Sequence, residues 1–121
     1  MVPVGPTFRS LNCRLDALLA QVAAAVEPGP LQTRLLELLG RAKERKEAAE
    51  AACLEPDVRG TKKLLKQAGR RMVDLGLTLR ARRAKKSIPA ELRDALREAA
   101  DGVRLDLRTL KKDVDCPDDA A

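Results

Sequence analysis

The chain has no histidine, tryptophan or tyrosine, and Phe8 and Ile88 are the sole residues of their types. β-Sandwiches and barrels depend on β-branched and aromatic side chains, so this scarcity argues against a sheet. The 121 residues are instead rich in leucine (20) and alanine (19), mixed with Arg, Lys and Glu, which all favour helix. The composition therefore predicts an all-α protein, and its length suffices for one domain with a single core.

The absence of histidine also argues against most enzymes. General acid–base catalysis at neutral pH commonly uses His, and a nucleophilic Cys usually needs His as its base. The patterns GxxxxGK[ST], GxGxxG and GxSxG do not occur either, so phosphate-loop, dinucleotide and hydrolase-elbow sites have no support. We therefore expect a protein that is not an enzyme and that needs no cofactor.

Proline-marked breaks divide the chain into four segments in which apolar residues recur at steps of three and four, as on one face of a helix. Thr7 or Ser10 is expected to cap the first helix and Asp57 the third, and Pro30 suits the first position of the second. The predicted helices cover residues 8–26, 31–54, 58–84 and 89–114, followed by an acidic tail at 115–121. Short connections favour antiparallel neighbours, so we predict an up-down-up-down four-helix bundle. A three-helix arrangement with the first helix detached is the alternative.

Small residues suggest where these helices approach closely. The inward stripe of the second helix becomes small at Ala42, Ala49, Ala52 and Cys53, and we expect a narrow bundle there. Glycines at positions 60, 69 and 76 of the third helix are expected to allow close helix contact, with a bend near Gly76 as a further option. The mixed-sign run from Lys43 to Glu47 is interpreted as solvated surface.

The three cysteines, Cys13, Cys53 and Cys116, all fall at the same end of an up-down-up-down bundle. We expect them to gather there as a candidate disulfide cluster, and each of the three pairings remains open. Reduced structural cysteines are the alternative. A metal site is disfavoured because CxxC and HxxxH pairs are absent.

The positive charge is concentrated in one segment. Residues 58–86 contain eleven basic residues and one acid, Asp74, whereas the rest of the chain has 13 basic and 17 acidic residues. Such clusters can bind phosphate, because neutralising it releases counterions. Neutralisation by acidic neighbours is the alternative, and cations at a helix end also complement its dipole. The candidate anion-binding residues are Lys62, Lys63, Lys66, Arg70, Arg71, Arg80, Arg82, Arg83, Lys85 and Lys86.

The order of the segments resembles a known family. Residues 35–57, 61–79 and 86–110 form a Leu-rich, a basic and an amphipathic segment with the sequences LLELLGRAKERKEAAEAACLEPD, TKKLLKQAGRRMVDLGLTL and KSIPAELRDALREAADGVRLDLRTL. This pattern is similar to the FIMAH-like domains, small helical domains of unknown function at the C-termini of secreted bacterial proteins. The resemblance covers about residues 31 to 110 and rests on pattern. It implies an accessory or interaction module outside the cytoplasm and transfers no functional residue.

We therefore expect a non-catalytic helical module that packs against another protein or a domain of a parent protein. The alternative is a nucleic-acid-binding protein that uses the basic third helix, and an anionic membrane surface would suit the same charges. No run approaches the length of a membrane span. The chain is expected to be a monomer or a homodimer. It would be cytoplasmic if Met1 is the natural start, and secreted or periplasmic if it is part of an exported protein.

Overall fold

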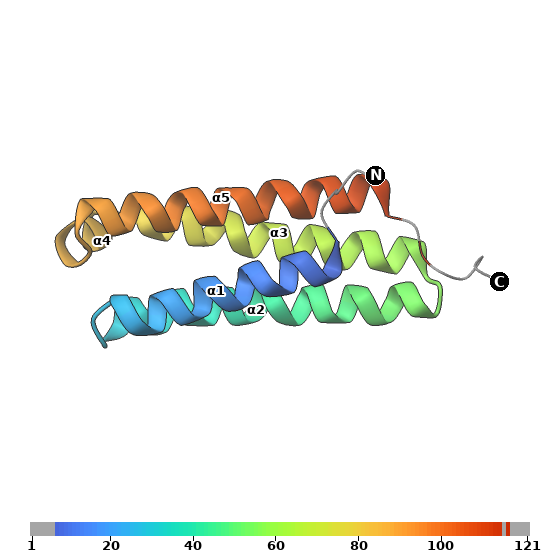
Figure 1. Ribbon diagram of the computed structural model, residues 1–121, viewed down its shortest axis with the longest axis horizontal. Helices are drawn as coiled ribbons and strands as arrows, with labels where there is room; N and C mark the ends of the chain where they lie inside the picture. Colours follow the sequence, from blue (N-terminus) through green and yellow to red (C-terminus); the bar gives the residue numbers. More distant parts are fainter. Residues whose placement is uncertain (1–6, 115, 117–121) are drawn as a thin grey trace.

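In a computed structural model, the chain is described over residues 7–114 and 116. These residues form helices and no strand, which confirms the all-α prediction. The elements are α1 (Phe8–Ala25), α2 (Pro30–Leu54), α3 (Val58–Arg80), α4 (Arg82–Ser87) and α5 (Ala90–Asp113). Figure 1 shows the long helices α1, α2, α3 and α5 lying lengthwise beside one another, with the short α4 at one end. The start of the chain and most of the expected acidic tail lie outside the described residues.

The helix starts follow local chemistry that the sequence indicated. Thr7 caps α1, where its hydroxyl accepts a hydrogen bond from the Ser10 backbone N–H at 3.0 Å and Ser10 reciprocates toward the Thr7 N–H at 2.9 Å. Pro30 is the first residue of α2, behind Gly29, whose φ of 153° favours glycine. Asp57 caps α3 and accepts from the Gly60 N–H at 2.9 Å.

The predicted end of the third helix is wrong. We expected it to cover residues 58–84, but α3 ends at Arg80 because Ala81 is extended, with ψ at 153°. The chain then turns into the six-residue α4. This break brings Ala84 and Ile88 into the core, where both are buried. Burial of these two apolar side chains gives a physical reason for the additional short helix, α4.

The core lies between the four long helices. Helix α1 packs on α2 and α5, and α3 packs on the same two helices from the other side, while α4 contacts α3 and α5. Leucines dominate the buried set, as the predicted stripes required, and Phe8 packs against its edge. The largest fully buried apolar side chains are Leu11, Leu15, Leu35, Leu38, Leu39, Leu65, Met72, Leu75, Leu79, Leu96 and Leu107.

The run from Lys43 to Glu47 is not all solvated surface, which corrects the sequence-based interpretation. Lys46 is 2% exposed and lies on the same buried stripe of α2 as Ala42, Ala49 and Cys53. Its ammonium donates to Asn12 Oδ1 at 3.2 Å and to Glu50 Oε1 at 3.4 Å. A buried ammonium needs such partners, because its loss of hydration is otherwise uncompensated. The small residues around it leave room for the long side chain.

The glycines of α3 do not serve close helix contact as expected. A Cβ added at Gly69 or Gly76 would meet nothing within 4 Å, so both positions face open space. A Cβ at Gly60 would meet the carboxylate of its own cap, Asp57, at 2.2 Å. Helix α3 is continuous through Gly76, and the break comes at Ala81 instead.

Candidate functional site

The basic side chains of α3 point to solvent because its apolar stripe takes the other face. Thr61, Leu65 and Ala68 are buried at steps of three and four. The residues left over for the outer face of this half of the helix are mostly cations. Lys62, Lys66 and Arg70 follow one another at four-residue steps and are exposed, as is Lys63. They form a ridge, the α3 basic ridge, defined as Lys62, Lys63, Lys66 and Arg70.

The second group of predicted cations lies around the break at Ala81. Arg80 ends α3, and α4 buries only Ala84 among its six residues. The side chains of Arg82, Arg83, Lys85 and Lys86 are therefore exposed. Arg70 and Arg80 are ten residues apart in one helix, which separates the two groups by about 15 Å.

Almost none of this charge is neutralised by an ion pair. Of the ten predicted anion-binding residues, Arg71 pairs with Asp74 one turn later, at 3.5 Å. Within residues 7–114 and 116, the other nine make no ion pair. The positive potential of the segment is thus left open to solvent and to any anionic partner.

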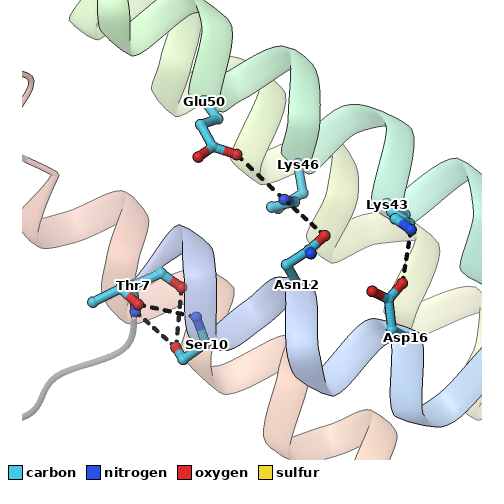
Figure 2. A network of polar contacts seen from close by, with 7 residues as sticks. All are labelled: Thr7, Ser10, Asn12, Asp16, Lys43, Lys46 and Glu50. Atoms are coloured by element: carbon cyan, nitrogen blue, oxygen red, sulfur yellow. Dashed lines mark hydrogen bonds and ion pairs between the residues drawn. The ribbon is translucent and has the colours of Figure 1, made fainter.

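The cations between α1 and α2 are arranged differently (Figure 2). Lys46 bonds Asn12 across the two helices, and Lys43 Nζ lies 2.7 Å from Asp16 Oδ1. The hydrogen bond to Asp16 raises the pKa of Lys43 above its usual 10.5, against an opposing effect of partial burial. Arg14 of α1 likewise pairs with Asp106 of α5. These three cations join helices, whereas the α3 basic ridge makes no ion pair to another helix in the part of the chain that the structure describes.

A groove of about 540 Å³ runs between α3 and α5, beyond the ridge. Val73 and Leu77 of α3 line it and are 44% and 57% exposed. Gly76 lies between them and leaves the floor open. The α5 wall carries Asp94 and Asp101, each paired with an arginine three residues later on the same helix. The groove thus offers apolar surface within a rim of mixed charge.

The three cysteines do not form one cluster. Cys53 and Cys116 are both buried and form a disulfide, with an S–S distance of 2.04 Å and a Cα–Cα distance of 4.9 Å. Cys13 is exposed and unbonded. Its neighbour Asn12 bonds Lys46, seven residues before Cys53, so Cys13 lies about two helical turns short of the disulfide. Within the described residues, no group of three or more potential ligands could hold a metal.

Two features of this surface escaped the sequence analysis. The basic residues near the end of α5, Arg108 and Lys112, were not grouped with the cations of α3, because a single sequence does not show which helices are neighbours. Lys46 was assigned to the surface, although it continues the spacing of Ala42 and Ala49 and could have been recognised from that period.

Searches of protein-family models, curated proteins and solved structures found no significant match to the chain. Among the described residues, no helix is both long and apolar enough to cross a membrane.

Proposed function

We propose that the chain is a non-catalytic helical module that binds the phosphate backbone of nucleic acid through the basic segment of α3 and α4. The observation that carries this proposal is that nine of the ten predicted cations make no ion pair among the described residues. Within the α3 basic ridge, cations one turn apart are about 5–6 Å from one another, and their charges act together because the Debye length at physiological salt is about 8 Å. The absence of histidine from the whole chain supports a role in binding rather than catalysis.

The proposal includes the topology that presents these cations. In it, α1, α2, α3 and α5 form the antiparallel up-down-up-down bundle, and α4 belongs to the connection between α3 and α5. The packing of α2 on α1 and α3, and of α5 on the same two helices, supports this arrangement. A closed ring of four helices leaves one face of each helix toward solvent, and on α3 that face carries the ridge.

Fluorescence anisotropy with a labelled mixed-sequence DNA duplex tests the proposal. We expect affinity to fall steeply with salt, since each phosphate contact contributes about 0.9 to the slope of log K against log salt. The variant Lys62→Gln/Lys66→Gln should lower that slope by about 2. Its matched control is Arg41→Gln/Arg45→Gln, which removes two exposed cations at the same spacing from α2. An affinity that does not depend on salt concentration, or an equal decrease of the salt slope in both variants, would contradict the proposal.

A second candidate function has its own support. We propose, as the alternative, an accessory module that packs against a protein or a parent-protein domain outside the cytoplasm, as the FIMAH-like resemblance implies. The Cys53–Cys116 disulfide favours it, because disulfides persist mainly in oxidising compartments. The exposed Val73 and Leu77 in the groove would provide the contact surface.

A thiol titration of the chain isolated from its natural host, without reductant, tests this alternative. We expect one reactive thiol in the denatured chain, from Cys13, and three after reduction. Three thiols before reduction would contradict an oxidising compartment and leave nucleic-acid binding as the sole candidate.

A further inference from the structure

The start of α3 lies beside the end of α5. Thr61, in the first turn of α3, has its Oγ1 3.8 Å from Sγ of Cys116, which follows α5 by three residues. The groove gives the same register, because Arg80 at the end of α3 lines it together with Asp94 from the start of α5. The two helices therefore run in opposite directions, side by side (Figure 1).

This register places a second row of cations beside the α3 basic ridge. Arg104 lines the groove with α3, and Arg108 and Lys112 continue its line along α5 at four-residue steps. On α3, Lys66 and Lys62 continue the line of Val73, which lines the same groove. The two rows thus run along the same outward face of the α3–α5 pair.

Arg104 of the α5 row pairs with Asp101, whereas the two cations that follow it are uncompensated like the α3 basic ridge. Arg108 and Lys112 are exposed and, within the described part of the chain, make no ion pair. Asp106 of α5 is engaged by Arg14 of α1, and Asp113, which follows Lys112, makes no ion pair among the described residues. Positive charge near the C-terminus of α5 also complements the helix dipole, but the dipole would favour cations on any face of the helix. It therefore does not explain why these two cations follow Arg104 on the face that borders the groove.

The two rows are held at a fixed spacing. The Cys53–Cys116 disulfide ties the segment after α5 to the end of α2, which α3 follows within four residues. Packed helices lie about 8–10 Å apart, so the cations form two parallel rows on a rigid surface. This differs from a flexible basic tail, which would follow a single strand of phosphates.

We propose that Arg108 and Lys112 of α5 complete the phosphate-binding surface and that the ligand is duplex rather than single-stranded nucleic acid. This inference rests on the proposed function and extends it to a second helix. Two rows of cations match the two phosphate strands of a duplex. Single-strand sites use aromatic side chains on which bases stack, and the one aromatic residue of this chain, Phe8, packs against the core.

The test compares Arg108→Gln/Lys112→Gln with the control Arg41→Gln/Arg45→Gln, using a labelled duplex and a single strand of equal length. Circular dichroism confirms that each variant is folded. We expect the α5 variant to lower the salt slope for duplex by about 2, and the control to lower it by less than 1. We also expect the wild-type chain to bind the duplex at least tenfold more tightly than the single strand.

The outcomes separate the two proposals. An unchanged slope in the α5 variant, with a reduced slope in Lys62→Gln/Lys66→Gln, would overturn the two-helix surface and leave the proposed function intact. Equal or tighter binding of the single strand would overturn the duplex assignment. Wild-type protein that binds neither probe in a salt-dependent way would overturn the proposed function and this inference with it.

Discussion

The contact between α1 and α2 and the outer face of α3 use the same residue types in opposite ways. Lys43 and Lys46 each meet an acid or amide of α1, and the Lys46 ammonium is withdrawn from water to do so. Lys62 and Lys66 are one turn apart on α3 and have no such partner among residues 7–114 and 116. Lys43 and Lys46 therefore help to join two helices, whereas the positive charges of Lys62 and Lys66 repel each other. Because this repulsion lowers the stability of the fold, the two lysines point to a role in binding.

The largest expected effect concerns the disulfide that ties the end of α2 to the segment after α5. Replacing the disulfide by Cys53→Ser/Cys116→Ser should lower the free energy of unfolding by about 4 kcal/mol, given the 63-residue separation of the two cysteines. Urea denaturation measures this value. The control is Cys13→Ser, which alters an exposed thiol and should leave stability unchanged. A double variant as stable as wild type would show that the disulfide does not hold the end of α5 in place.

The next effect tests the buried lysine. Asn12→Ala removes one of the two partners of the Lys46 ammonium and should cost roughly 1–3 kcal/mol, because a buried charged donor is left undersatisfied. Lys46→Met, which removes the charge and keeps the volume, should change stability much less, since apolar replacement of buried ions is often neutral or stabilising. Thermal unfolding distinguishes the two. If both variants lose the same stability, the amide is not the required partner.

A smaller effect of opposite sign is expected on α3. Lys62→Gln/Lys66→Gln removes a like-charge pair at four-residue spacing and should raise the free energy of unfolding by about 0.2–0.5 kcal/mol. The same variant should weaken duplex binding, so stability and binding move in opposite directions. Paired urea and anisotropy measurements check this. A loss of stability would mean that these lysines have a structural role and would remove the contrast with α1 and α2.

The smallest effect is the pH dependence of the half-exposed Lys43. Its pKa is raised in the folded state by the hydrogen bond to Asp16, so the stabilisation is fully present below the unfolded value of 10.5. It is lost as the pH rises through the raised folded pKa. Urea midpoints of wild type and Asp16→Asn should therefore differ below pH 10.5 and converge above the folded pKa. A difference that persists at high pH would contradict this origin.

How much the sequence could predict depended on whether the determinant was local. Leucine spacing, the Asp57 cap and the prolines at the helix starts are encoded within a few residues, so the helices were placed within about one turn. The break at Ala81 was missed because alanine favours helix, and burial of Ala84 and Ile88 is a tertiary effect.

The candidate site shows the same division. The cations of α3 could be identified from the sequence alone. Whether they have partners depends on which residues the neighbouring helices present. The pairing of Cys53 with Cys116 likewise depends on where α5 ends relative to α2, and the separate position of Cys13 depends on where α1 begins relative to α2. Helical periodicity identifies a face, whereas register between helices follows from packing.

Lysine footprinting with an acetylating reagent, with and without a DNA duplex and followed by mass spectrometry, tests whether the lysines of α3 bind the duplex while those between α1 and α2 do not. All lysines are compared in one sample, so the two regions serve as controls for each other. We expect the duplex to protect Lys62, Lys63, Lys66 and Lys112 and to leave the modification of Lys43 unchanged. Protection that is equal at Lys43 and Lys66, or absent from both, would contradict this expectation.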